Sequence, residues 1–184
     1  MEQELDVYRN RFSLADFTGQ GYDKGRPKFI QALWLLTSGC LVSRWWCPNY
    51  LRIKVLRAFG ATIGSGVLVR HNVEIHWPWK LKIGENSWIG SGVWILNLEE
   101  VSIGANTCLS QGVLVCTGSH DRRSPSFEFD NAPIAIGDHV WVCARATILR
   151  GVSIEDGVTI GATSLITRDV QAGRTVLALA GGVL

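Results

Sequence analysis

Residues 136–166 read IGDHVWVCARATILRGVSIEDGVTIGATSLI, and an aliphatic side chain returns at every sixth position, from Ile136 to Ile166. A period of six fits neither the alternation of an ordinary strand nor the 3.6-residue period of a helix. Six residues can form one flat strand and a corner, and three such sides close a triangular coil. Stacked coils bury their inward side chains in a continuous aliphatic column. The stretch therefore predicts a β-solenoid.

The same period runs upstream to Ile63. Its nine further positions are Ile63, Val69, Ile75, Ile83, Ile89, Ile95, Ile103, Leu109 and Val115. Glycine follows the first residue of successive coils at Gly64, Gly84, Gly104 and Gly137, where it relieves crowding. We expect an all-β domain over residues 61–184 with about five coils, which start at Ile63, Ile83, Ile103, Ile136 and Ile154.

Composition excludes several other classes. Among 184 residues, 47% are apolar and 18% charged, which is unlike a disordered chain. A net charge of +2 argues against a nucleic-acid binder. The five cysteines form no Cys-x-x-Cys pair, which argues against a zinc ribbon and a thioredoxin motif. Because their number is odd and the sequence shows no signal peptide, we expect reduced thiols in the cytoplasm. The longest uncharged apolar run, residues 29–43, is too short to cross a membrane comfortably.

Residues 1–60 differ in character from the repeat. Met1–Arg26 is expected to be an extended arm, and Pro27 and Pro48 open two predicted helices, the second ending at Gly60. In the first helix, Phe29, Leu33, Leu36 and Cys40 recur at helical spacing.

Charge in this region is one-sided. No acidic residue stands between Asp23 and Glu74, but eight basic residues do. Two compatible interpretations follow. The helices cap the solenoid core, or residues 24–60 lie on an anionic membrane surface with Trp45 and Trp46 at headgroup level.

One coil is interrupted by a polar insertion, Asp121–Pro133, with the sequence DRRSPSFEFDNAP. Polar loops on rigid scaffolds are common places for function. His120 stands just before it at a corner position, so its imidazole should point outward and could act as a general base. Asp121 could orient that imidazole or only open the loop turn. Ser119 is interpreted as a small inward residue.

These repeats, with the histidine before an external loop, resemble the hexapeptide-repeat acyltransferases over residues 61–171. The resemblance implies a left-handed parallel β-helix and acetyl transfer from acetyl-CoA to a hydroxyl, with His120 as the base. It implies direct transfer, so neither an acyl-enzyme nor a metal is expected. It also implies a homotrimer with sites at the subunit interfaces.

The resemblance assigns coenzyme roles to five further residues. Trp141 would line the transfer site, backbone amides near Ala144 and Ala162 would hold the pantetheine arm, and Arg168 and Arg174 would meet the phosphates. Three of the five have ordinary alternatives: Trp141 as outer-face packing, and the two arginines as solvated charges.

Three motifs are similar to the colanic acid biosynthesis acetyltransferases: WPWKL at 77–81, Asn97-Leu98, and CTGSHD at 116–121. That similarity implies a saccharide acceptor carried on a lipid during exopolysaccharide assembly, and a peripheral contact at the inner face of the cytoplasmic membrane. Some sugar acetyltransferases place an active-site asparagine one coil before the histidine. The candidates here are Trp94 and Asn97. Relatives usually continue with Gly-Asn-Pro-Ala, which the ending Ala180–Leu184 lacks, so a coenzyme or trimer contact is expected to differ there.

Other functions remain open from the residues alone. The acceptor could be an antibiotic or a free small sugar. The same solenoid serves a class of carbonic anhydrases that bind zinc through three histidines, and His71 and His76 have a four-residue gap between them. No third histidine precedes His71, which counts against that class. A non-catalytic scaffold would leave His120 and its loop unexplained.

Overall fold

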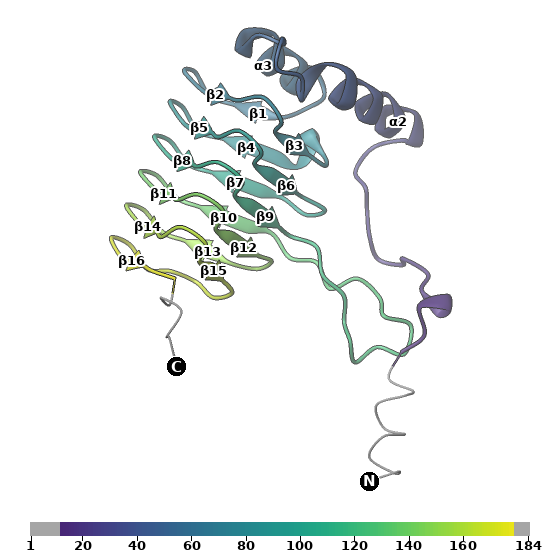
Figure 1. The fold of residues 1–184 in the computed structure, drawn as a ribbon. Coiled ribbons are helices and arrows are strands. Elements are labelled where there is room, and N and C mark those ends of the chain that lie inside the picture. Colours follow the sequence, from purple (N-terminus) through teal and green to yellow (C-terminus); the bar gives the residue numbers. More distant parts are fainter. Residues whose placement is uncertain (1–11, 179–184) are drawn as a thin grey trace.

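The computed structural model describes residues 12–178. Within them, sixteen short strands stack in parallel into three sheets, which form the faces of a prism (Figure 1). The first sheet holds β1 (Thr62–Ile63), β4 (Leu81–Ile83), β7 (Val101–Ile103), β10 (Ile134–Ile136) and β13 (Ser153–Ile154). The second holds β2 (Leu68–Val69), β5 (Trp88–Ile89), β8 (Cys108–Leu109), β11 (Trp141–Val142), β14 (Thr159–Ile160) and β16 (Thr175–Val176). The third holds β3 (Glu74–Ile75), β6 (Trp94–Leu96), β9 (Leu114–Cys116), β12 (Thr147–Leu149) and β15 (Leu165–Ile166).

The strand register follows the six-residue period. Ile63 pairs with Ile83, Ile83 with Ile103, and Ile103 with Ile136, so each predicted aliphatic position stacks on its equivalent one coil away. All fifteen such positions are buried, between 0% and 7% exposed. The predicted parallel β-helix behind an N-terminal helical segment is confirmed. The β-helix has slightly more than the five predicted coils, because β16 adds part of a sixth turn beside β14.

Glycine has the predicted role at the coil starts. A Cβ atom on Gly84 would lie 2.4 Å from the backbone nitrogen of Ala105 in the next coil. No side chain can occupy that space without separating the coils, whose strands are held at about 4.8 Å by their hydrogen bonds.

Two helices lie across the first coil. Helix α2 (Lys28–Thr37) continues into a π-helical turn (Ser38–Val42), and α3 (Asn49–Ala58) follows. The first coil has no strand above it, so its backbone groups would lack partners. The helices supply them: the Trp34 indole N–H donates to the carbonyls of Ile75 and His76 at 3.1 and 2.9 Å. The helical segment therefore caps the solenoid.

Arg52 extends this cap. Although its side chain is buried, its guanidinium donates to four carbonyls, those of Val42, Arg44, Cys47 and Val69, at 2.6 to 2.9 Å. One cation thus ties α3, the turn before it and the first coil together.

The apolar residues that recur at helical spacing in α2 do not form its inward face. Trp34 is fully buried, whereas Phe29, Leu33 and Leu36 are 50% to 69% exposed and Cys40 is also exposed. Trp34 faces inward because its indole can both fill the end of the core and donate a hydrogen bond. The stripe is left on the outer surface.

The start of the predicted arm, residues 1–11, and the ending Ala180–Leu184 lie outside the described residues.

Candidate functional site

His120 lies where the chain leaves the coil of β9 and enters the insertion. Its Nδ1 atom is 2.8 Å from the carbonyl oxygen of Phe127. A carbonyl can only accept a hydrogen bond, so the neutral imidazole carries its proton on Nδ1. The lone pair on Nε2 is thereby available to take a proton.

Aromatic rings fix the plane of this imidazole. Phe127 stacks on it at 4.4 Å between centroids with an interplanar angle of 2°, and Phe129 stacks at 5.0 Å. Phe17, from the N-terminal segment, meets it edge-on at 5.5 Å. The ring is therefore held on several sides by apolar surfaces.

The insertion is an ordered excursion paired with its own ends. His120 and Phe129 form an antiparallel bridge, and the Asp121 N–H donates to the Glu128 carbonyl at 2.8 Å. Asp130 donates its N–H to the Ser119 carbonyl, and its carboxylate pairs with Arg150 of the next coil. In this region Thr117 is fully buried and Ser119 only half-buried, so the inward position predicted for Ser119 is taken by Thr117.

Two roles were considered for Asp121, to orient the imidazole or to open the loop turn, and its contacts are those of the turn. Its Oδ1 atom accepts the N–H of Arg123 at 2.8 Å, and its side chain is exposed. The contact that orients the imidazole comes from the Phe127 carbonyl, which sequence reasoning missed. A backbone carbonyl leaves no signal in residue types. Asp121 therefore stays at the site as the residue that shapes the loop.

The two candidates for acceptor binding differ in exposure. Trp94 is 45% exposed on the third sheet. Asn97 is fully buried, and its amide accepts the Trp77 N–H and donates to the carbonyls of Trp77 and Lys80. These bonds engage both ends of the amide, so Asn97 stabilises the 77–80 turn.

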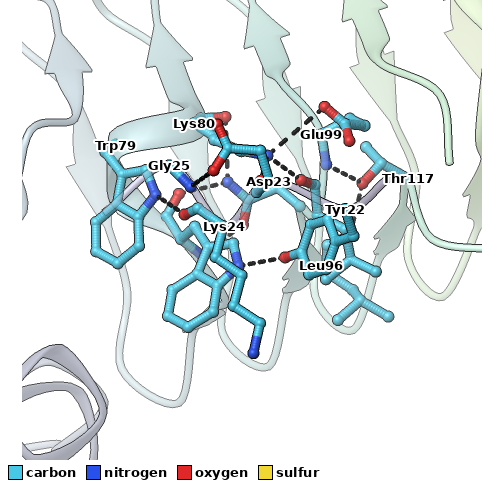
Figure 2. A network of polar contacts seen from close by, with 12 residues as sticks. Tyr22, Asp23, Lys24, Gly25, Trp79, Lys80, Leu96, Glu99 and Thr117 are labelled. Carbon is cyan, nitrogen blue, oxygen red and sulfur yellow. Dashed lines mark hydrogen bonds and ion pairs between the residues drawn. The ribbon is translucent and has the colours of Figure 1, made fainter. Parts of the chain in front are cut away.

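Figure 2 shows how the N-terminal segment contacts that turn. The Trp79 indole N–H donates to the Lys24 carbonyl at 2.7 Å, and Lys80 Nζ donates to the Asp23 carbonyl at 2.6 Å. Lys80 also donates to the Leu98 carbonyl and lies 3.6 Å from the Glu99 carboxylate. The WPWKL motif thus anchors residues 22–25 beside the coil that leads to His120.

The residues with predicted coenzyme roles lie elsewhere on the prism. Trp141 is 54% exposed on β11 of the second sheet, and Ala144 and Ala162 occupy equivalent corners one coil apart. Among residues 12–178, neither alanine N–H has a hydrogen-bond acceptor. Arg168 and Arg174 are exposed in the last coils. The structure therefore separates this set from His120, which follows β9 of the third sheet.

A groove of about 400 Å³ lies between α2 and the third sheet. Its lining includes Leu35, Arg44, Glu74, His76 and Trp94. Burial lowers the pKa of His76, and the charge of Lys24 adds to this effect. The groove combines the exposed indole of Trp94 with polar and charged groups.

Metal ligands do not converge in the part of the chain that the structure describes, where no three of its His, Cys, Asp and Glu side chains are grouped. Across residues 12–178, no helix has the length and apolar character needed to span a bilayer.

Comparisons with known proteins agree with the fold and the motifs. A family model described as "Bacterial transferase hexapeptide (six repeats)" matches residues 133–168. The chain is 36% identical over 156 residues to "Putative colanic acid biosynthesis acetyltransferase WcaF" of Escherichia coli (strain K12), covering 83% of this chain and 84% of that protein. It is 30% identical over 122 residues to the galactoside O-acetyltransferase of the same organism, covering 65% and 60% of the two chains.

A solved structure shares the architecture. The hexapeptide-repeat acetyltransferase VCA0836 of Vibrio cholerae O1 biovar eltor, complexed with acetyl coenzyme A, superposes with a TM-score of 0.78 at 20% identity. The match covers 91% of this chain and 94% of that one.

Proposed function

The chain belongs to the hexapeptide-repeat acetyltransferases, and from this membership we propose that it transfers an acetyl group from acetyl-CoA to a saccharide hydroxyl in exopolysaccharide assembly. The observation that carries the proposal is the fixed tautomer of His120. The Phe127 carbonyl, 2.8 Å from Nδ1, leaves Nε2 as the basic atom.

The proton balance of the reaction closes with the two substrates and His120. Nε2 takes the proton of the acceptor hydroxyl as the oxygen attacks the thioester carbonyl, and the C–S bond breaks in the resulting tetrahedral intermediate. The imidazolium returns its proton to the departing thiolate, so the products are the acetyl ester and coenzyme A. General-base catalysis of this kind contributes about 10²–10⁴-fold.

The coenzyme site is completed by a second copy of the chain. His120 follows β9 of the third sheet, whereas Trp141 lies on β11 of the second sheet, so one chain alone presents the two functions at different faces of the prism. We propose a homotrimer in which His120 of one protomer faces Trp141, the Ala144 and Ala162 amides and the basic Arg168 and Arg174 of the next. Three equivalent sites result.

Mixed trimers test this arrangement. His120→Ala and Trp141→Glu should each be inactive, and trimers assembled from both chains should regain activity at sites that combine the two intact residues. Recovery supports a shared site. If mixed trimers of confirmed composition stay inactive, the shared site is contradicted.

We infer the class of acceptor from the outer surface of the helical cap. Phe29, Leu33, Leu36, Trp45 and Trp46 are 50% to 80% exposed. Trp34 and Arg52 contact the first coil from the same helices, so the exposed stripe of α2 points away from the prism. Apolar and tryptophan side chains amid basic residues are typical of an interfacial membrane contact.

We therefore propose that residues 24–60 dock on anionic lipid and that the acceptor saccharide is lipid-linked. The relative WcaF is named for colanic acid biosynthesis, which favours such an acceptor over a free sugar or an antibiotic. The groove with Trp94 and Arg44 opens beside the same helices.

Vesicle co-sedimentation tests the docking. The protein should bind phosphatidylglycerol vesicles, bind phosphatidylcholine vesicles weakly, and release in high salt. Leu36→Asp should abolish binding, whereas Leu165→Asp, an equally exposed leucine on β15, should not. Equal binding by both variants would contradict the assignment. So would a change of oligomeric state in Leu36→Asp without loss of vesicle binding, since it would indicate a second copy of the chain on this surface.

An acceptor assay tests the reaction. Release of coenzyme A thiol from acetyl-CoA should depend on a lipid-linked saccharide. A preference for free sugars or aminoglycosides would favour the alternative acceptors, and no release with any acceptor would contradict acetyl transfer to a hydroxyl.

A further inference from the structure

Residues 12–19 lie against the insertion and close to His120, although more than 100 positions separate them in the sequence. Figure 1 shows this purple N-terminal segment, with its short 3-10 helix Leu14–Asp16, beside the tip of the green loop. We call residues 12–19 the strap. The acetyl-transfer mechanism assigns no role to it, and the sequence pattern singled it out only as an arm.

A single carboxylate binds the strap. Glu128 Oε1 accepts the backbone N–H and the hydroxyl of Thr18, both at 3.0 Å, and Oε2 accepts the N–H of Gly19 at 3.0 Å. The Ser13 N–H adds a bond to the Pro125 carbonyl at 2.8 Å. Three donors on one charged acceptor make Glu128 the principal polar link between strap and loop, because charge-assisted bonds are about twice as strong as neutral ones.

Glu128 also lies between the two loop residues that contact His120. It stands between Phe127, whose carbonyl holds Nδ1, and Phe129, which pairs with His120. Its own carbonyl accepts the N–H of Asp121. Any shift of Glu128 therefore moves both neighbours of the imidazole.

Aromatic side chains of the strap also pack against the imidazole and the rings beside it. Phe12 stacks on Phe127 at 4.3 Å between centroids, and Phe17 packs edge-on against both His120 and Phe129. Phe127 has a positive φ of 53°, a backbone conformation that phenylalanine rarely adopts and that persists only where surrounding contacts impose it. The stacked Phe12 ring and the Glu128 clamp are contacts of that kind.

We propose that Glu128 is a positioning residue for acetyl transfer: by clamping the strap to the loop, it keeps the Phe127 carbonyl on Nδ1 and the imidazole in its productive tautomer. The inference rests on the proposed role of His120 as base. Glu128 touches neither substrate nor the reacting atoms and acts only through Phe127, Phe129 and the strap.

The variant that tests this is Glu128→Gln, which keeps the shape but offers one acceptor oxygen in place of two. Glu155→Gln is the matched control, because Glu155 also accepts a backbone N–H through its carboxylate, that of Ala172 at 2.9 Å, in a coil away from His120. Thr18→Val is a milder second variant. It removes the hydroxyl bond to Glu128 and the bond that the hydroxyl accepts from the Gln20 N–H, and it leaves both backbone bonds to the carboxylate.

Three readouts separate positioning from a structural role: kcat with the KM for acetyl-CoA, the thermal midpoint, and the nitrogen-15 shifts of His120, assigned by comparison with His120→Gln. Glu128→Gln should lower kcat about ten-fold, which corresponds to about 1.4 kcal/mol in the barrier. The KM for acetyl-CoA should not change, and the shifts should move from a single Nδ1–H tautomer toward a mixture. Thr18→Val should do the same to a smaller degree, and Glu155→Gln should do neither.

An unchanged tautomer signal in Glu128→Gln would overturn the proposal, as would equal kcat losses in Glu128→Gln and Glu155→Gln. The shift measurement needs no turnover, so it is independent of the acceptor. If His120→Ala keeps full activity, the general-base role fails instead, and the tautomer result for Glu128 is still readable.

Discussion

The solenoid and the strapped loop are held together by opposite means. In the coils, identical aliphatic positions stack in register, and backbone ladders repeat from Ile63 to Ile166. In the loop, one-off contacts dominate: a carboxylate on two backbone amides, a carbonyl on an imidazole, and rings from segments distant in sequence. Changes in the coils should therefore reduce stability, and changes in the loop should reduce turnover with little loss of stability.

The largest effect on stability is expected from Ile148→Ala. Ile148 is fully buried and stacks between Val115 and Ile166. Removing its branched side chain should cost about 2–5 kcal/mol of unfolding free energy, because a close-packed column cannot collapse onto the cavity. Chemical denaturation measures it, and a loss below about 0.5 kcal/mol would contradict the stacked core.

A smaller loss is expected at the cap. Arg52→Met keeps the apolar part of the side chain but leaves four carbonyls without their donor. Each buried carbonyl left unsatisfied costs about 1–3 kcal/mol. A hollow of about 210 Å³ borders Arg52, Cys47 and Val69, so water replaces part of the lost bonds and the net loss should stay below that of Ile148→Ala. The thermal midpoint should still fall by several degrees. Lys54→Met, an exposed cation on the same helix, is the control and should leave the midpoint unchanged. Equal midpoints in the two variants would mean that the guanidinium does not hold the cap.

Changes in the strap should lower kcat and leave the stability unchanged. Phe17→Leu retains an apolar side chain but loses the ring edge against His120, 5.5 Å between centroids. We expect kcat to fall a few-fold, because the imidazole loses one of the rings that hold its plane. The denaturation midpoint should stay within error of the parent protein. A stability loss without a kcat change would make the strap an ordinary part of the fold.

The smallest effect is expected when the pH is lowered through the pKa of Glu128. Hydrogen bonds from the Thr18 backbone and side chain, Ser126 and Gly19 hold the pKa of Glu128 below its ordinary value of 4.5. A carboxylate whose pKa is lowered on folding stabilises the clamp above 4.5, and that contribution is lost as pH falls through the lowered value. The amide resonances of Thr18 and Gly19 should therefore move in a transition below pH 4.5. That transition should vanish in Glu128→Gln, and one that persists there would belong to another group.

Sequence alone predicts the part of the molecule that repeats. A six-residue period fixes register, inward positions and the coil-start glycines such as Gly84, because each coil meets the same physical constraints as the last. It also places His120 at the coil's exit, where the structure has it. The helices behind Pro27 and Pro48 were predictable from capping and periodicity.

The parts of the molecule that do not repeat could not be predicted in the same way. The apolar repeat of α2 does not indicate which face packs inward, and Trp34 faces the core because the open end of the first coil needs a hydrogen-bond donor. Asn97 looked like an acceptor ligand, but its amide is used on the 77–80 turn. The Phe127 carbonyl and the Glu128 clamp depend on backbone atoms and on a strap more than 100 residues away, which no local pattern encodes.

We propose a separation of roles in which His120 performs the chemistry and other residues bind acetyl-CoA. Its most direct test is calorimetric titration of acetyl-CoA into the parent protein and into His120→Ala, paired with a transfer assay on the same samples. We predict one site per chain in both, with unchanged affinity, and transfer reduced by about 10²-fold or more in the variant. Retained transfer in His120→Ala, or no coenzyme binding by the parent protein, would contradict the account.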